Sequence, residues 1–317
     1  MRIAILTSGG DAPGMNATIR AVVRTCIFEG IEVYGIMGGY EGLIDAKFEK
    51  LIEASVADII QRGGTILSTT RSERFQTDEG FEKALNSLKI FEIDALIVLG
   101  GDGSLRGAKK LCEAGINVVG IPCSIDNDMG YTDYTIGFMT AVRTVTEAIS
   151  NIRDTTEAHG RANVVEVMGR ECGDIALFSG VSSGAESIIV PEFPMNINEI
   201  AEKALVGKNR GKRHHIIIMA EGCGSAFEFA KEFEKLTGID TRVTVLGYIQ
   251  RGGAPSIFDR ILASEFGYHA VYFAKDKKSG ALGSVKGKII MESFEDVFNI
   301  KKKFRQDLLE ILKTVSI

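Results

Sequence analysis

Short apolar runs alternate with longer amphipathic segments along the first half of the chain. The run Ile3–Leu6 predicts a first strand, and Asp94–Leu99 is apolar on both faces, which is typical of a central strand of a parallel sheet. Between them, Met15–Glu29 repeats its apolar residues at helical spacing. This alternation predicts βαβ units, and therefore an α/β domain built on a mainly parallel sheet.

A second series of strand and helix patterns follows a long amphipathic segment over residues 138–157. The length of 317 residues also fits two domains. We therefore expect two doubly wound, mainly parallel domains of three-layer αβα type, with the active site at the carboxyl ends of the strands in the cleft between them. Their predicted extents are residues 1–137 plus 251–300 and residues 138–250 plus 301–317, the last helix being Lys301–Val315.

The apolar run Ile116–Ile121 is followed at once by polar side chains. Pro122 is expected to end this strand because it has no N–H to donate. Ser124 and the carboxylates Asp126 and Asp128 come next. Two such carboxylates indicate either a turn rich in Asp and Asn, which is common, or a catalytic or metal-binding loop at a strand end.

Two glycine-rich loops end neighbouring strands of the same predicted sheet. They are residues 7–14 and 100–104, and each leads into a helix, with Ser104 as a candidate N-cap. Glycines let backbone N–H groups approach a phosphate, although such loops are often only tight turns. Neither loop is a dinucleotide or Walker motif, which disfavours a dehydrogenase. Asp102 suits Mg²⁺, which takes few protein carboxylates together with phosphate oxygens.

Composition narrows the class of protein. The chain is 45% hydrophobic and 25% charged, as in an ordinary globular protein. The formal net charge of −5 argues against binding to nucleic acid or to an anionic membrane, and no apolar run reaches the roughly 18 residues of a membrane span. Five scattered cysteines without a C-x-x-C pair favour the reducing cytoplasm.

The second half of the chain contributes cations beside strand ends and glycine turns. They are Arg161, Arg170, Arg242 and Arg251. Arginine is suited to phosphate because its planar guanidinium donates two hydrogen bonds at once, although any single arginine is usually a surface charge. Glu221 follows a strand, where it can accept hydrogen bonds from sugar hydroxyls or simply begin a helix. Together these features favour phosphoryl transfer from Mg-nucleotide to a phosphorylated acceptor.

Five stretches carry a resemblance to a known family. They are residues 7–16, 100–104, 124–128, 166–170 and 247–253. In colinear order from Met1 to about Ser293, the chain resembles the bacterial ATP-dependent 6-phosphofructokinases. The resemblance implies transfer of the γ-phosphoryl group of ATP to the 1-hydroxyl of fructose 6-phosphate, the committed step of glycolysis.

The resemblance also assigns the site residues. It implies Asp126 as general base, assisted by Ser124, Arg71, Arg170 and Gly10. The implied ATP site comprises Gly10, Arg71, Ser72, Gly101, Asp102, Gly103 and Ser104, with Asp102 also holding Mg²⁺. The implied substrate contacts are Ser124, Ile125, Asp126, Arg161, Met168, Gly169, Arg170, Glu221, Arg242, Tyr248, Ile249, Gln250 and Arg251.

The family pattern further implies a homotetramer, in which Arg161 and Arg242 serve a neighbouring subunit's site. It also implies an effector site for ADP and phosphoenolpyruvate at Arg20, Arg24, Glu53, Arg153, Gly184, Glu186, Arg210, Lys212, Arg213 and His214. The alternative is that these are solvated surface charges. Glu53 stands where a basic residue is usual, so a weakened or altered response is expected.

Three further positions depart from the family pattern. Tyr248 replaces a common histidine, and Ser72 and Gln76 replace an aromatic and a basic residue beside Arg71. Gly103 and Cys123 bear on the donor, because pyrophosphate-using relatives typically carry Asp and Lys there. Gly103 therefore favours ATP. Two rival hypotheses are a kinase related to NAD or lipid kinases, and a non-catalytic sensor on the same Gly-Gly-Asp-Gly scaffold.

Overall fold

The computed structural model describes residues 1–316, which form two compact units. Unit 1 comprises residues 1–125, 129–140 and 251–302. Unit 2 comprises residues 126–128 and 141–250, together with the chain from Lys303 onward. Each unit is built on its own sheet, and the chain enters unit 2 briefly at Asp126 before returning.

Unit 1 contains an eight-stranded sheet with the order β12-β11-β5-β4-β1-β2-β3, to which β6 is added beside β5. Its strands are β1 (Arg2–Thr7), β2 (Glu32–Ile36), β3 (Phe48–Leu51), β4 (Ala95–Gly100), β5 (Asn117–Ser124), β6 (Ile136–Gly137), β11 (Gly280–Val285) and β12 (Lys288–Glu292). The inner pairs are parallel, whereas β3 and β12 pair antiparallel at the two edges. The mainly parallel sheet predicted from the sequence is therefore confirmed.

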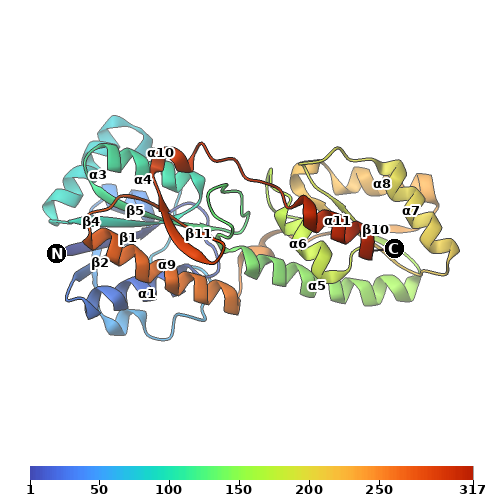
Figure 1. Ribbon diagram of the computed structural model, residues 1–317, viewed down its shortest axis with the longest axis horizontal. Helices are drawn as coiled ribbons and strands as arrows, with labels where there is room; N and C mark the ends of the chain where they lie inside the picture. Colours follow the sequence, from blue (N-terminus) through green and yellow to red (C-terminus); the bar gives the residue numbers. More distant parts are fainter. Residues whose placement is uncertain (317) are drawn as a thin grey trace. The chain divides into compact units, whose positions relative to one another are not determined.

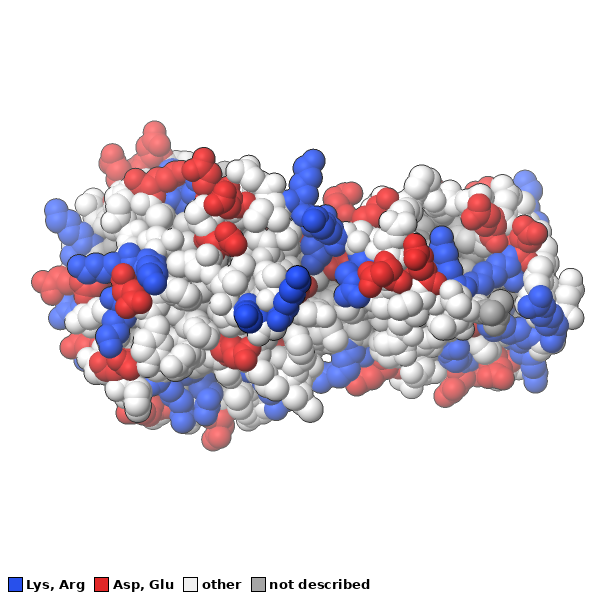
Figure 2. All heavy atoms as spheres, viewed as in Figure 1, with Lys and Arg blue, Asp and Glu red and all other residues white. Residues whose placement is uncertain are grey.

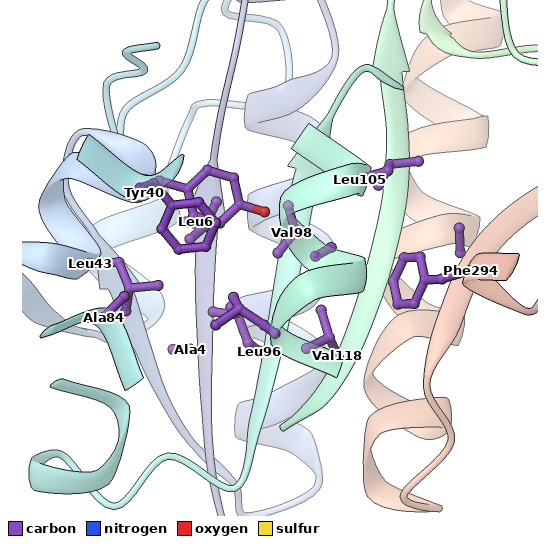
Figure 3. Close-up of a cluster of buried hydrophobic side chains, with 14 of the residues drawn as sticks. Ala4, Leu6, Tyr40, Leu43, Ala84, Leu96, Val98, Leu105, Val118 and Phe294 are labelled. Carbon is purple, nitrogen blue, oxygen red and sulfur yellow. The ribbon is translucent and has the colours of Figure 1, made fainter. Parts of the chain in front are cut away.

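Helices cover both faces of this sheet (Figure 1). They are α1 (Met15–Phe28), α2 (Gly39–Ile44), α3 (Asp78–Ile90), α4 (Asp102–Glu113), α9 (Ile257–Lys275) and α10 (Phe294–Val297). Helices α1 and α9 pack together on one face. On the other face, buried side chains of α2, α3, α4 and α10 meet Leu6, Leu96, Val98 and Val118 of the sheet (Figure 3). Burial of these side chains stabilises the packing of the helices on the sheet whose strand ends carry the polar loops.

Unit 2 has a four-stranded parallel sheet with the order β10-β7-β9-β8. Its strands are β7 (Ala162–Val167), β8 (Ser187–Ile189), β9 (His215–Ala220) and β10 (Thr241–Val245). Its helices are α5 (Phe138–His159, which begins in unit 1), α6 (Asp174–Ser183), α7 (Ile197–Asn209), α8 (Ala226–Thr237) and α11 (Gln306–Val315). Helices α7 and α8 share one core with the sheet, and α6 packs on α11 in another.

Short 3-10 turns complete both units. They are η1 (Glu53–Val56), η2 (Arg74–Gln76), η3 (Glu221–Cys223) and η4 (Gly247–Arg251). On the face shown in Figure 2, acidic and basic side chains alternate over both units, in keeping with the small net charge. Within residues 1–316, no helix has the length and apolar character needed to cross a membrane.

Three local predictions are wrong. Pro122 does not end its strand, because β5 continues to Ser124 and β6 pairs with Cys123 and Ser124 beyond the proline. Ser104 is not the N-cap of α4, which begins at Asp102 after Gly101. The last helix begins at Gln306, so the basic residues from Lys301 to Arg305 lie outside it.

Candidate active site

Three polar loops of unit 1 meet at one edge of its sheet. Strands β1, β4 and β5 are neighbours and run parallel, so their carboxyl ends lie side by side. The Ser8 amide donates to the Leu99 carbonyl at 2.9 Å, and Ser104 Oγ lies 3.2 Å from the place where a Cβ on Gly9 would stand. The clustering of the two glycine loops and the Ser124 loop expected from the sequence is therefore observed.

The glycines of this edge differ in what packing requires of them. A Cβ at Gly100 would lie 2.5 Å from Ser104 Oγ and 2.6 Å from the Ser8 carbonyl oxygen, so this position must be glycine. A Cβ at Gly103 would meet no atom within 4 Å. Glycine inside a helix costs about 0.8–1 kcal/mol relative to alanine. The packing of the fold therefore does not require a glycine at position 103, and the space beside it is open.

Asp102 is the first residue of α4, and its side chain is half-exposed. Its Oδ2 lies 2.8 Å from Arg106 Nε, one helical turn further on. Among residues 1–316, no three His, Cys, Asp or Glu side chains are placed to hold a metal together. A single accessible carboxylate beside glycine N–H groups nevertheless fits Mg²⁺ in its nucleotide-bound form, where phosphate oxygens and waters complete the coordination.

Arg251 belongs to unit 1 and lies against the first glycine loop. Its Nη2 donates to Asp11 Oδ1 at 3.0 Å. The same nitrogen lies 2.4 Å from the place where a Cβ on Gly10 would stand, so a side chain at Gly10 would displace this guanidinium. The structure therefore joins Arg251, predicted as a substrate contact, to the loop predicted to bind ATP.

In unit 2, Asp126 is paired with Arg170. The Asp126 side chain is only 9% exposed, and its Oδ2 lies 3.3 Å from Arg170 Nε. The next residue, Asn127, adopts a left-handed backbone with φ of 54°, and its side-chain amide donates to Asp174 Oδ2 at 2.8 Å. Left-handed conformations of non-glycine residues are uncommon and need surrounding contacts to hold them. Asp174 therefore fixes the backbone that presents Asp126.

Arg170 is itself held in an uncommon conformation. Its φ is 52°, and its backbone N–H donates to Glu221 Oε1 at 2.9 Å. The adjacent Gly169 has a φ of 132°, which favours glycine. Asp126, Arg170 and Glu221 are thus connected through direct contacts in one unit, although they lie on three separate segments of the chain.

The Gln250 side chain holds two predicted substrate-binding segments together. Its side chain is fully buried, accepts from the Met168 amide at 3.1 Å and donates to the Gly247 carbonyl at 3.1 Å. We therefore assign the Gln250 side chain to holding Met168 and η4 in place instead of contacting substrate. The neighbouring Tyr248 and Ile249 are exposed.

Arg161 and Arg242 share one carboxylate. Asp240 Oδ2 accepts from Arg161 Nε at 2.6 Å and from Arg242 Nη2 at 3.3 Å. Arg161 precedes β7 and Met168 follows it. A strand of that length separates its two ends by about 20 Å at roughly 3.3 Å per residue. Arg161 and Arg242 therefore lie at the amino ends of the strands in unit 2, whereas Arg170 lies at their carboxyl ends.

The predicted effector residues are spread over both units. In unit 2, Arg153 donates to the carbonyl oxygens of Ser183 (2.6 Å) and Gly184 (3.1 Å). Glu186 is buried and lies 2.9 Å from Lys212 Nζ and 3.5 Å from His214 Nε2. In unit 1, Arg20 and Arg24 follow one another by a single turn of α1, and Glu53 is exposed in η1. Burial and the neighbouring Arg24 charge lower the pKa of Arg20.

Sequence reasoning missed the acids that hold Arg251, Arg161 and Asn127 in place. Asp11, Asp240 and Asp174 appear in the sequence as ordinary turn or surface acids. Only Asp11 carried a signal, because it lies inside the first glycine loop. The others become visible only when strand pairing brings distant segments together, as when β10 lies beside β7.

A glycine-rich sheet end in one unit and a buried carboxylate paired with arginine in the other indicate the class of α/β phosphotransferases. The family model described as Phosphofructokinase matches residues 2–274, and the chain belongs to that family. It is 56% identical over 316 residues to the ATP-dependent 6-phosphofructokinase of Finegoldia magna and 57% identical over 316 residues to that of Alkaliphilus metalliredigens. Each comparison covers 99% of both chains.

A solved structure supports the same family assignment. The structure of phosphofructokinase from Saccharomyces cerevisiae matches with a TM-score of 0.91 and 34% identity. The match covers 98% of this chain and 50% of the yeast chain, so the present chain spans half the length of that relative.

Proposed function

We propose that the chain phosphorylates fructose 6-phosphate at the 1-hydroxyl, using Mg-ATP and giving fructose 1,6-bisphosphate and ADP. This is the committed step of glycolysis. Unit 1 is the ATP- and Mg²⁺-binding domain, and unit 2 is the fructose 6-phosphate-binding domain. The single observation that carries the proposal is the buried Asp126 paired with Arg170 in a chain of this family.

Asp126 acts as the general base. A carboxylate is ionised at neutral pH and accepts a proton when it lies within hydrogen-bond reach. The proton of the sugar 1-hydroxyl passes to Asp126 while the oxygen forms a bond to the γ-phosphorus. The bond from that phosphorus to the β,γ-bridging oxygen breaks, and ADP leaves with the bonding electrons. Ser124, two residues before Asp126, orients the reacting groups through its hydroxyl.

Positive charge around the transferring group supplies most of the remaining catalysis. Phosphoryl transfer depends mainly on positioning and on neutralising the equatorial oxygens. We assign this role to Arg71 and Arg170, with backbone N–H groups of the Gly10 loop. Glu221 fixes the Arg170 backbone, which supports a second role for this residue beside binding the sugar.

Mg²⁺ is assigned to Asp102. When bound, it neutralises the phosphate charge of ATP and orients its β- and γ-phosphoryl groups. Asp102 has to exchange the Arg106 contact for the metal. Because that ion pair is half-exposed and spans one turn of α4, it is worth only about 0.3–0.5 kcal/mol, and releasing it is easy.

The proposal that active sites are shared between subunits is supported by the separation of two sets of predicted substrate contacts in unit 2. Arg161 and Arg242 lie at the amino ends of the strands, whereas Arg170 and Glu221 lie at the carboxyl ends. One chain therefore cannot direct all four residues at the same bound sugar phosphate. In a homotetramer, the pair from a neighbouring subunit completes the cradle for the 6-phosphate together with Tyr248 and Arg251.

ADP and phosphoenolpyruvate are proposed as effectors. In unit 2, the cations Lys212 and Arg153 support an anion site. Glu53 weakens the response because a carboxylate repels phosphate. Titration of phosphoenolpyruvate against fructose 6-phosphate saturation tests this; strongly sigmoidal curves relieved by ADP would contradict the role given to Glu53.

We also place the enzyme in the cytoplasm. All five cysteines are free thiols, and three of them, Cys26, Cys123 and Cys172, are buried. Free thiols are typical of reducing compartments.

The activity is tested by a coupled assay for ADP with purified protein, Mg²⁺, ATP and fructose 6-phosphate. We expect turnover that requires all three reactants. ADP release no faster than in the absence of the sugar phosphate would reject the proposed activity, and would favour the non-catalytic sensor.

A further inference from the structure

The chain on both sides of Arg71 is tied to the rest of unit 1. Thr69 Oγ1 donates to the Gly9 carbonyl at 3.0 Å, and Thr70 Oγ1 donates to the Gly38 carbonyl at 2.8 Å. On the other side, Phe75 is buried and stacks on Tyr40 with ring centroids 4.1 Å apart. The backbone that carries Arg71 is therefore anchored to the first glycine loop and to α2.

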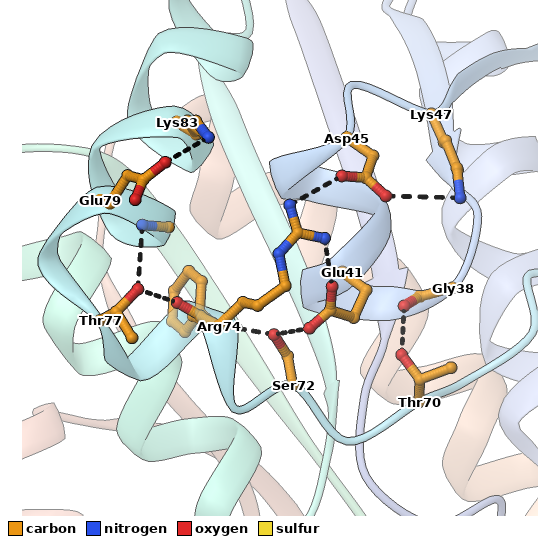
Figure 4. A network of polar contacts seen from close by, with 12 residues as sticks. Gly38, Glu41, Asp45, Lys47, Thr70, Ser72, Arg74, Thr77, Glu79 and Lys83 are labelled. Atoms are coloured by element: carbon orange, nitrogen blue, oxygen red, sulfur yellow. Dashed lines mark hydrogen bonds and ion pairs between the residues drawn. The ribbon is translucent and has the colours of Figure 1, made fainter.

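Glu41 of α2 collects the contacts that follow Arg71 (Figure 4). Ser72 Oγ donates to Glu41 Oε1 at 2.5 Å, and Arg74 Nη1 donates to Glu41 Oε2 at 2.8 Å. Arg74 Nη2 donates to Asp45 Oδ1, the residue directly after α2, at 3.0 Å. Ser72 Oγ also accepts the Phe75 amide at 3.0 Å. Both carboxylate oxygens of Glu41 are thus used to hold this segment.

Arg71 itself is left outside this network. Its side chain is exposed, and within residues 1–316 it makes no hydrogen bond or ion pair, whereas Arg74 uses two of its nitrogens on acids of α2. A surface arginine between tied residues commonly folds onto a nearby acid. Here Glu41 and Asp45 are already engaged by Ser72 and Arg74, so the Arg71 guanidinium remains available to a ligand.

We propose that Ser72, Glu41 and Arg74 form a positioning network that presents Arg71 to the nucleotide phosphates; this rests on the proposed use of ATP. Ordering a free loop on binding would consume part of the binding energy, and a segment ordered beforehand avoids that loss. The network also accounts for Ser72, where an aromatic residue is common in the family, because the serine hydroxyl donates to Glu41 and an aromatic hydrocarbon ring has no such donor.

The test compares Glu41→Gln and Ser72→Ala with the wild-type enzyme. We expect kcat/KM for ATP to fall about tenfold in each, as for loss of one charge-assisted hydrogen bond. KM for fructose 6-phosphate should stay within about twofold, and Ser72→Thr should restore most of the loss. Glu79→Gln is the matched control because the Glu79–Lys83 pair, 2.6 Å apart on α3, is equally polar but does not hold the Arg71 segment.

A double variant separates positioning from general damage. If the network acts through Arg71, Glu41→Gln should have almost no further effect on kcat/KM for ATP in an Arg71→Ala background. Full additivity, or unchanged kcat/KM for ATP in both single variants, would overturn the proposal. Loss of folded protein would instead lower the apparent kcat and leave the KM values for ATP and fructose 6-phosphate unchanged. That result would also count against the proposal.

A binding measurement keeps the proposal distinct from the proposed reaction. Calorimetric titration with Mg-ATP alone should show a Kd about tenfold weaker for Glu41→Gln than for wild type and Glu79→Gln. If the wild-type protein fails to phosphorylate fructose 6-phosphate, the reaction assignment fails, while this difference in ATP affinity would still support the network. Equal ATP affinities would reject the network whether or not the reaction occurs.

Discussion

Replacing Gly103 by Asp should separate the stability of the chain from its use of ATP. Position 103 is in the first turn of α4, and a Cβ there meets no atom within 4 Å, so the new side chain fits. Removing a glycine from a helix and adding an acid near its N-terminus together stabilise by about 0.5–1 kcal/mol. Gly103→Asp should therefore unfold at or slightly above the wild-type temperature.

The same substitution should severely weaken ATP binding. A carboxylate about 5 Å from a phosphate charge near a protein surface opposes it by about 3 kcal/mol, which corresponds to about a hundredfold loss of affinity. We expect kcat/KM for ATP to fall by about that factor, and pyrophosphate should not replace ATP in the wild-type enzyme. Steady-state kinetics at fixed Mg²⁺ and thermal unfolding measure the two effects.

Gly103→Asn is the matched control, since it has nearly the same size and no charge. It should lose no more than about tenfold in kcat/KM for ATP, because only steric crowding remains. Near wild-type use of ATP by Gly103→Asp would refute the assignment of this position to the nucleotide. A fall of several degrees in the unfolding temperature of Gly103→Asp would refute the conclusion that a side chain at position 103 fits without clashes.

Three further predictions address the base, the shared site and the pH range. Asp126→Ser should lower kcat by about a hundredfold or more, as loss of a general base does; turnover close to wild type would remove Asp126 from that role. Mixing Arg161→Ala with Asp126→Ser subunits, by unfolding and refolding them together, should recover part of the activity, since hybrid oligomers contain sites with both residues intact, and no recovery would argue for sites within one chain. Burial lowers the pKa of His215 to about 4 from its usual 6.5, so the unfolded chain takes up a proton that the folded chain refuses. Stability should be full above pH 6.5 and fall by about 2 kcal/mol between pH 7 and pH 5; urea unfolding that shows the same loss in His215→Gln would contradict this cause.

The sequence predicted the parts of the site that follow from strand order. Apolar runs marked β1, β4 and β5, and parallel strands place their carboxyl ends at one edge, so the clustering of the two glycine loops with Ser124 could be expected. The same reasoning could not foresee β6. A proline normally limits a strand, but here β6 takes over the pairing of Cys123 and Ser124.

Pairings between distant segments could not be predicted from pattern alone. Arg170 and Glu221 were both singled out from the sequence, yet nothing in it indicated that Glu221 would hold the Arg170 backbone. Glu41 and Asp240 were not singled out, because an acid that orients an arginine resembles any surface acid until the fold brings them together. The sequence therefore indicates which groups do the chemistry more readily than which groups position them.

The most direct measurement of the proposed reaction is ³¹P NMR of the products formed from ATP and fructose 6-phosphate. The wild-type enzyme should convert the sugar phosphate into a bisphosphate with a new phosphomonoester resonance at carbon 1, in step with ADP, and Asp126→Ser should form it at least about a hundredfold more slowly. Release of inorganic phosphate in step with ADP, or a new phosphate at any other sugar oxygen, would contradict the proposed function.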